Sequence, residues 1–221
     1  LKVALSTLNT GRLTLPAACV GLMRSCLKIS REWSATREQW GCVIGKHQAI
    51  ADKIAKIAAK SFATESIVLF TSSLVDGKKA DIRVESAMCK MWGTEEAWKV
   101  ADETMQIRGG RGYETADSLK NRGMEPIPVE RYLRDCRINL IFEGSSEIMR
   151  LLLAREALDP HLKAAGAVLN SRLPLMVRLK AAIGAGLFYA RWYPKQWLPT
   201  FNSGPRGCSS SVGKYLRFVA K

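Results

Sequence analysis

The sequence predicts an all-α fold: an up-down four-helix bundle followed by a basic helical extension. Apolar residues recur at helical spacing over long stretches, short turns separate the stretches, and few segments show the period-two alternation of strands. The chain has 221 residues, 47% of them hydrophobic, which is enough for a sizeable core. No apolar run of about 18 residues is uninterrupted, so we expect no ordinary transmembrane helix.

Residues 1–35 are predicted to be helical, with one interruption. Asn9–Arg12 is typical of a break or kink, and Pro16 suits the first turn of a restarted helix. Residues 37–41 are predicted to form a helix-ending turn that stops at a glycine. Because Leu1 opens directly into the helical pattern, we expect the chain to be the C-terminal piece of a longer protein.

The remaining bundle helices follow in order. The clearest has Ile50, Ile54 and Ile57 at helical spacing. A glycine-rich break over 109–113 and a polar loop to Pro128 precede the shorter helices. The predicted helices cover residues 47–75, 80–108 and 129–138, with a last one that begins after Ser145 and ends near Ala157.

The six cysteines form no C-x-x-C pair and have no spacing typical of metal ligands. Only two histidines are present, so no metal site is predicted. Most of the cysteines fall within helical patterns. We interpret them as reduced, small hydrophobic residues of an intracellular protein.

Charge divides the chain near residue 160. Residues 160–221 hold ten Lys or Arg and no Asp or Glu, so they carry +10 of the net charge of +14. We therefore predict two domains, a helical bundle over 1–159 and a basic, aromatic-rich extension over 160–221. No nucleic-acid-binding motif accompanies the charge. Apolar and aromatic residues interleaved with cations over 165–201 favour an anionic membrane surface, with packing on the bundle as the alternative.

One carboxylate occupies a conspicuous position. Glu143 lies between an apolar run and Gly144, and Ser145 is a good N-cap candidate for the helix that follows. A desolvated carboxylate is a stronger base than a solvated one. The alternative is an ordinary loop glutamate that the positive end of a helix dipole favours.

Four separated segments together resemble the C-terminal α-helical domain of the acyl-CoA dehydrogenases, and the resemblance covers roughly residues 1–158. Any one of them would be weak, but they occur in the family's order. They are Asn9–Arg12, REQWG at 37–41 with His47 and Gln48, QIRGGRGY at 106–113, and RDCRINLIFEGSSEIMR at 134–150. The basic extension is similar to that of the long- and very-long-chain, membrane-associated branch.

The resemblance implies a flavoenzyme of fatty-acid β-oxidation. Such an enzyme uses FAD to desaturate an acyl-CoA to a trans-2-enoyl-CoA and passes electrons to an electron-transferring flavoprotein. It also implies two preceding domains that are not in this chain, so the chain alone should be inactive. A homodimer or homotetramer in the bacterial cytoplasm, with or without attachment to the inner membrane, is expected, and the mitochondrial matrix is the alternative.

The same resemblance assigns roles to individual residues. Glu143 matches the catalytic base, and its own backbone N–H would help to hold the thioester oxygen. Arg37 matches an arginine that reaches the FAD of a neighbouring subunit, and residues 106–110 match a segment that approaches FAD across the dimer. The expected FAD contacts are Arg37, Glu38, Gln39, His47, Gln48, Gln106, Ile107, Arg108, Gly109, Gly110, Ser145, Ser146 and Glu147. The expected acyl-CoA contacts are Asn9, Thr10, Gly11, Arg12 and Gly144.

Two other functions fit the sequence less well. A non-catalytic assembly or scaffold protein on the same fold would not need Glu143 and all of the flavin-contact segments. A flavin oxidase acting on a substrate other than a CoA ester would more often have Asp at the position of the base.

Overall fold

The computed structural model describes the backbone of residues 2–77 and 81–197 and the side chains of residues 10–77 and 81–194. The chain divides into two compact units, residues 1–155 and residues 156–221, which are described separately. The division falls inside a continuous helix. The predicted domain bounds of 1–159 and 160–221 stay a prediction.

Helices make up nearly all of the described chain, which confirms the predicted all-α class. The elements are α1 (Lys2–Thr36), β1 (Glu38–Gln39), β2 (Cys42–Val43), η1 (Ile44–Lys46), α2 (Gln48–Asp76), α3 (Arg83–Arg108), α4 (Gly110–Tyr113), α5 (Ala116–Asn121), α6 (Val129–Arg137), η2 (Ile138–Leu140), α7 (Ser146–Leu169) and α8 (Leu175–Trp197).

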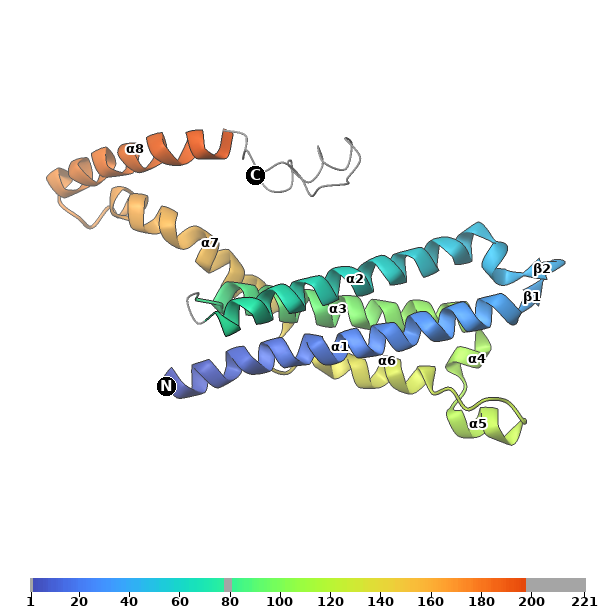
Figure 1. The fold of residues 1–221 in the computed structure, drawn as a ribbon. Helices are drawn as coiled ribbons and strands as arrows, with labels where there is room; N and C mark the ends of the chain where they lie inside the picture. Colours follow the sequence, from blue (N-terminus) through green and yellow to red (C-terminus); the bar gives the residue numbers. More distant parts are fainter. Residues whose placement is uncertain (1, 78–80, 198–221) are drawn as a thin grey trace. The chain divides into compact units, whose positions relative to one another are not determined.

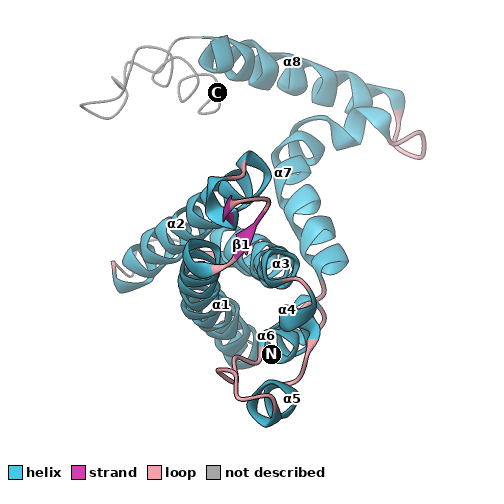
Figure 2. Cartoon of the chain, turned by 90° about the vertical axis from the view of Figure 1, so that its right-hand side faces the viewer, coloured by secondary structure: helices cyan, strands magenta, loops and turns pink. Residues whose placement is uncertain are grey.

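The N-terminal unit is an up-down bundle of α1, α2, α3 and α6. Successive helices reverse direction, and α3 contacts each of the other three (Figures 1 and 2). The main core lies between these helices, and its buried residues include Met23, Cys26, Ile57, Val100 and Cys136. Small residues on α3, such as Ala97 and Ala101, are fully buried and allow its neighbours to approach closely.

The predicted interruption of the first helix is wrong. Helix α1 runs unbroken through Asn9–Arg12 and holds Pro16 in its interior. Packing of one face against α2 and α3 outweighs the low helix propensity of Asn9 and Gly11. Pro16 is fully buried, and a Cβ built on Gly93 of α3 would lie only 2.7 Å from the Cβ of Pro16. The two helices are therefore in close contact at this point.

The first helix ends at Thr36, as predicted, but residues 37–41 belong to a β-hairpin. Strands β1 and β2 pair antiparallel, with Gln39 opposite Cys42. Trp40 (φ 50°) and Gly41 (φ 80°) occupy the two central positions. Positive φ at both positions is what a two-residue type I′ hairpin turn requires.

Two later segments also differ from the prediction. The loop expected up to Pro128 contains α5, whose first turn is capped when Thr115 Oγ1 accepts a hydrogen bond from Ser118 N–H at 3.2 Å. The helix predicted to begin after Ser145 does not end near Ala157. It continues as α7 to Leu169, through Pro160.

The C-terminal unit consists of the end of α7 and α8, joined by a short turn. His161 stacks on Tyr189 and meets Trp192 edge-on, and His161 Nδ1 lies 3.2 Å from the Tyr189 hydroxyl oxygen. Arg178 Nε donates to the Val168 carbonyl oxygen at 3.1 Å. Aromatic and polar contacts thus hold the two helices of this unit together.

By length and mean hydropathy, the Thr10–Thr36 part of α1 is the one described helix that could cross a membrane. The same stretch supplies Cys19, Met23 and Cys26 to the bundle core. Packing within the bundle accounts for part of its apolar character, since 33% of its most apolar window is buried.

Because α1 and α3 are in close contact at Gly93, a Gly→Ala substitution there should lower the stability of the bundle, the opposite of its usual effect inside a helix. Inside a helix, alanine is normally favoured over glycine by about 1 kcal/mol. In Gly93→Ala the new methyl would overlap Pro16 and crowd Thr64, so we expect a loss of about 1–3 kcal/mol in the free energy of unfolding. Gly21→Ala, on α1 with open space around the new Cβ, should instead be stabilising. Urea unfolding compares the variants; a stabilised Gly93→Ala would contradict the packing described.

Candidate functional site

Glu143 lies in a strained turn between η2 and α7. Its φ is +58°, and the following Gly144 has φ +99°. Trp40 is the only other residue besides glycine with a positive φ in the described part of the chain. A left-handed conformation costs an ordinary residue about 1–2 kcal/mol, so the surroundings must hold Glu143 in it.

Three hydrogen bonds hold this turn. Lys90 Nζ, from α3, donates to the Gly144 carbonyl oxygen at 2.5 Å, and Arg12 Nε, from α1, donates to the Glu143 carbonyl oxygen at 3.4 Å. Ile148 N–H donates to Ser145 Oγ at 3.4 Å, which confirms that Ser145 caps α7. Two other segments of the bundle and the start of α7 thus fix the backbone on both sides of the Glu143 side chain.

The Glu143 carboxylate lies against α1. A Cβ built on Gly11 would be 2.9 Å from Glu143 Oε2, so a larger residue at position 11 would collide with the carboxylate. Oε2 is buried and has no hydrogen-bond partner. A buried carboxylate oxygen without a donor is destabilising in itself and is free to accept a proton.

Lys90 and Arg12 make this site cationic. Lys90 is fully buried, and Arg12 is half-buried. Burial lowers the pKa of Lys90, and the nearby charge of Arg12 lowers it further. The Glu143 turn therefore has one half-buried and one fully buried cation beside it.

The predicted acyl-CoA contacts other than Gly144 are consecutive residues of α1. Gly11 and Arg12 adjoin Glu143 and Gly144, whereas Thr10 is exposed. The side chain of Asn9 lies outside the described residues. Gly144 packs on Met149, since an added Cβ would lie 2.5 Å from the Met149 methyl carbon.

A second group of predicted residues surrounds a cavity of about 470 Å³ at the hairpin end of the bundle. Segments far apart in the sequence meet there: the end of α1, the hairpin, the start of α2 and the junction of α3 with α4. Among its lining residues are Arg37, Gln39, Trp40, His47, Arg108, Gly109 and Gly110.

Several contacts order this cavity. His47 Nε2 lies 3.1 Å from the Gln39 carbonyl oxygen, and the His47 ring meets Trp40 edge-on. The Arg108 guanidinium lies over the Trp33 ring, 4.8 Å from its centroid. Arg108 Nε is buried without a hydrogen-bond partner, and burial lowers the pKa of Arg108. The cavity thus holds a desolvated cation that has no hydrogen-bond acceptor at this nitrogen.

Some predicted FAD contacts do not line this cavity. Glu38, Gln48 and Gln106 are exposed, and Ile107 is part of the hydrophobic core.

The last three predicted FAD contacts, Ser145, Ser146 and Glu147, adjoin Glu143 instead. Ser146 Oγ is buried without a partner. Hydrogen bonds from its own backbone N–H and from Ser145 lower the pKa of Glu147.

Sequence reasoning missed Lys90 at the first site, and Trp33, Arg111 and Glu114 at the second. A signal for Lys90 was present, because it shares one helical stripe with Ser86, Thr94, Ala97 and Ala101. Because a helix stripe of small residues is expected to face a neighbouring helix, a lysine within it is expected to be buried. Arg111 and Glu114 belong to α4 and its C-cap, which the sequence did not predict, and Trp33 lies near the end of α1.

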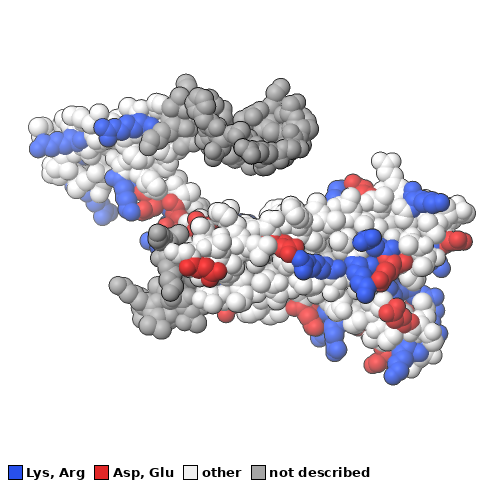
Figure 3. Space-filling model, in the orientation of Figure 1, with Lys and Arg blue, Asp and Glu red and all other residues white. Residues whose placement is uncertain are grey.

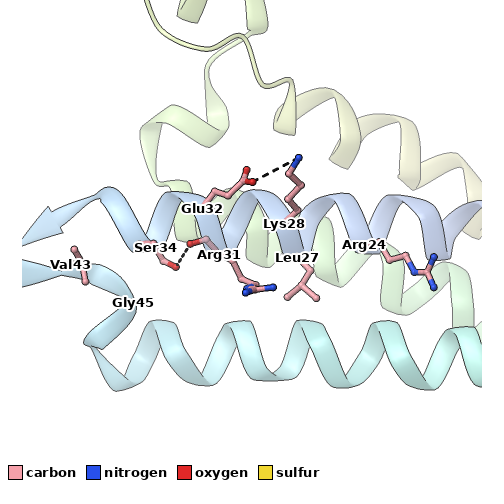
Figure 4. Close-up of a pocket in the computed structure, with 9 residues that line it drawn as sticks. Arg24, Leu27, Lys28, Arg31, Glu32, Ser34, Val43 and Gly45 are labelled. Atoms are coloured by element: carbon pink, nitrogen blue, oxygen red, sulfur yellow. Dashed lines mark hydrogen bonds and ion pairs between the residues drawn. The ribbon is translucent and has the colours of Figure 1, made fainter.

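A larger cavity of about 680 Å³ lies beside α1 and holds none of the predicted site residues. Leu27 and Arg31 point from α1 toward α2, and Lys28 pairs with Glu32 on the solvent side (Figure 4).

Comparison with known families identifies this domain. Residues 1–158 match the family model described as "Acyl-CoA dehydrogenase, C-terminal domain". The chain belongs to the acyl-CoA dehydrogenase family.

The curated relatives are proteins longer than this chain. The chain is 55% identical to the probable acyl-CoA dehydrogenase FadE10 of Mycobacterium tuberculosis, and the match covers 100% of this chain and 34% of the relative. It is 35% identical over 84% of its length to the human mitochondrial very long-chain specific acyl-CoA dehydrogenase, of which it covers 29%. The chain thus spans about a third of the length of these relatives.

Solved structures of this family share the fold. Butyryl-CoA dehydrogenase from Megasphaera elsdenii matches with a TM-score of 0.64 and 29% identity, covering 71% of this chain and 38% of that one. A chain from a structure titled for the electron-transferring flavoprotein of Acidaminococcus fermentans matches with a TM-score of 0.64 and 32% identity, covering 71% of this chain and 38% of that one.

The junction of α3 and α4 gives a prediction about stability. Gly109 has φ 61° and ψ −141°, a conformation that is nearly restricted to glycine, whereas a Cβ on Gly110 would meet open space. We expect Gly109→Ala to lower the free energy of unfolding by about 1–3 kcal/mol and Gly110→Ala to change it by less than about 0.5 kcal/mol. Thermal unfolding followed by circular dichroism measures the difference, and equal melting temperatures for the two variants would refute it.

Proposed function

We propose that the chain is the C-terminal helical part of an FAD-dependent acyl-CoA dehydrogenase of fatty-acid β-oxidation, and that Glu143 is its catalytic base. The observation that carries this proposal is the buried, unpartnered carboxylate oxygen of Glu143. Its turn is held by two cations, and Gly11 leaves room for it.

The reaction desaturates the acyl chain between its α and β carbons. Glu143 removes the α-proton of the thioester, and the electron pair of that C–H bond becomes part of the new double bond. The β-hydrogen leaves with its electron pair, and FAD, when bound, supplies the acceptor for this hydride. The Glu143 N–H stabilises negative charge that develops on the thioester oxygen.

The cavity at the hairpin end fits one part of FAD. Arg108 has a buried N–H without an acceptor, Arg37 is a second cation, and Gly109 and Gly110 leave open space beside the backbone. Guanidinium groups and a close backbone approach suit a pyrophosphate. We propose that Arg37, His47 and residues 108–110 hold the FAD of a neighbouring subunit, which requires at least a homodimer.

We further propose a long-chain acyl-CoA as substrate and an electron-transferring flavoprotein as electron acceptor. Similarity to very long-chain dehydrogenases supports the first. A structural neighbour whose title names an electron-transferring flavoprotein supports the second. The similarity to the mycobacterial relative supports a bacterial cytoplasmic location.

Features of α8 support association with an anionic membrane surface. Leu175, Leu179, Ile183 and Leu187 recur every fourth residue and are all more than half exposed. The visible face of α8 carries basic side chains and no acidic ones (Figure 3). An exposed apolar stripe bordered by cations is typical of an interfacial helix.

Flavin absorbance tests the catalytic proposal on the full-length, FAD-loaded enzyme. Palmitoyl-CoA should bleach the flavin and butyryl-CoA should not. Glu143→Gln should keep the cofactor and reduce it about 100- to 10,000-fold more slowly, because no base removes the α-proton.

Glu32→Gln, an exposed change on α1, is the matched control and should reduce at the wild-type rate. If no acyl-CoA bleaches the wild-type flavin, the enzyme proposal is wrong and a scaffold role is favoured.

Flotation with vesicles that contain anionic phospholipid tests the membrane proposal. Replacing Leu179, Ile183 and Leu187 with serine should abolish co-flotation, because the apolar stripe is lost while every charge is kept. Leu69→Ser with Phe70→Ser, exposed residues of α2, is the control and should float as the wild type does. Unchanged flotation after deletion of residues 165–201 would overturn the proposal.

A further inference from the structure

Lys90 is in an unusual position for a lysine. Its exposure is 0%, and it is the largest fully buried side chain in the described part of the chain. Burying an ammonium group costs several kcal/mol unless partners compensate. Within the described residues Lys90 forms no ion pair with a carboxylate; its hydrogen bond goes to the Gly144 carbonyl oxygen at 2.5 Å.

This hydrogen bond acts on the backbone that carries Glu143. Arg12 Nε holds the Glu143 carbonyl oxygen, and Lys90 Nζ holds the next carbonyl along the chain. Rotation of either peptide plane would break one of these bonds. The direction of the Glu143 Cα–Cβ bond, which is set by the left-handed φ of +58°, therefore depends on both cations.

Stability of the bundle gives no reason for a lysine here. An apolar side chain of similar length would fill the same volume without the cost of burying a charge. What an apolar residue could not do is donate a hydrogen bond to the Gly144 carbonyl oxygen.

We propose that Lys90 is a positioning residue that holds the Glu143–Gly144 turn so that the Glu143 carboxylate points at the α-carbon of the substrate. This inference rests on the proposed function of Glu143. Lys90 lies behind the turn, in the core between α1 and α3, and it acts on the reaction through the backbone.

Titratable groups on α1, on α3 and in the Glu143 turn make this role dependent on pH. Arg12 on α1 and burial lower the Lys90 pKa, whereas Cys19 on α1, Glu95 on α3 and Glu143 raise it. The net shift is downward, so Lys90 loses its proton at a lower pH than an exposed lysine does. A neutral amine is a weaker donor than an ammonium, and the turn should loosen as the pH rises through this pKa.

The test compares Lys90→Met with wild type in the full-length, FAD-loaded enzyme, by stopped-flow reduction of the flavin with palmitoyl-CoA. Misplacement of a catalytic group by about 1 Å costs on the order of 100-fold in rate. We expect the reduction rate to fall about 10- to 100-fold and the KM to change less than about threefold. The melting temperature should be unchanged or higher. The alkaline fall of the wild-type rate should be absent from the variant.

Lys99→Met is the matched control, because it removes a lysine from the exposed side of the same helix. It should reduce at the wild-type rate. A Lys90→Met rate within about twofold of wild type overturns the proposal, as does a variant that keeps the alkaline fall. If Lys90→Met does not load FAD, the same measurements are made on Lys90→Gln; failure of both variants to load FAD overturns the positioning role in favour of a structural one.

Reduction of the wild-type flavin by palmitoyl-CoA distinguishes a failure of the proposed function from a failure of the inference about Lys90. If palmitoyl-CoA reduces the wild-type flavin, the enzyme proposal stands whatever Lys90→Met does. If it does not, the proposed function fails and the inference about Lys90 fails with it.

Discussion

The hydrogen bond from Lys90 to the Gly144 carbonyl oxygen is the interaction on which the arrangement of the Glu143 site depends. It joins the N-terminal third of α3 to a turn some fifty residues later in the chain. A buried ammonium needs a good acceptor, and the Gly144 carbonyl oxygen supplies it.

The spacing of α1 and α3 is set close to this point. Pro16 and Gly93 touch one helical turn from Arg12 and Lys90, respectively. Pro16 also has no N–H to offer the Arg12 carbonyl, so the α1 backbone is free to adjust where Arg12 reaches the turn. The residues that bring the helices together thus lie next to the residues that hold the Glu143 turn.

Unpartnered buried polar atoms gather at the two sites. In the part of the chain that the structure describes, five buried side-chain atoms have no hydrogen-bond partner, and Arg108 Nε, Glu143 Oε2 and Ser146 Oγ are three of them. Each of these atoms lowers stability unless something binds it. A carboxylate oxygen at one site and a guanidinium N–H at the other match a proton donor and an anionic ligand, respectively.

Much of this arrangement was predictable from the sequence. Helical periodicity was sufficient for the four bundle helices, and the composition of the Glu143 stretch indicated the site. Helix propensity gave the wrong prediction at Asn9–Arg12, because tertiary packing extends α1 through weak helix formers. It also failed at Trp40, where a bulky residue takes a positive φ that short-range rules assign to Gly or Asn. The role of Lys90 could not be predicted, since it depends on a contact with a distant segment.

Helix α3 connects the two sites and fixes their separation. Lys90 and Arg108 are about five helical turns apart on one face of this helix, which places them roughly 27 Å from each other along its axis. A hydrogen-bonded helix holds that distance without reference to the loops, so the segment that contains α5 can vary without moving either site. In the proposed function, Glu143 acts beside the reactive end of its own FAD, and the cavity at Arg108 holds the FAD of another subunit. The rigidity of one core helix would then set the relation between two active sites of an oligomer.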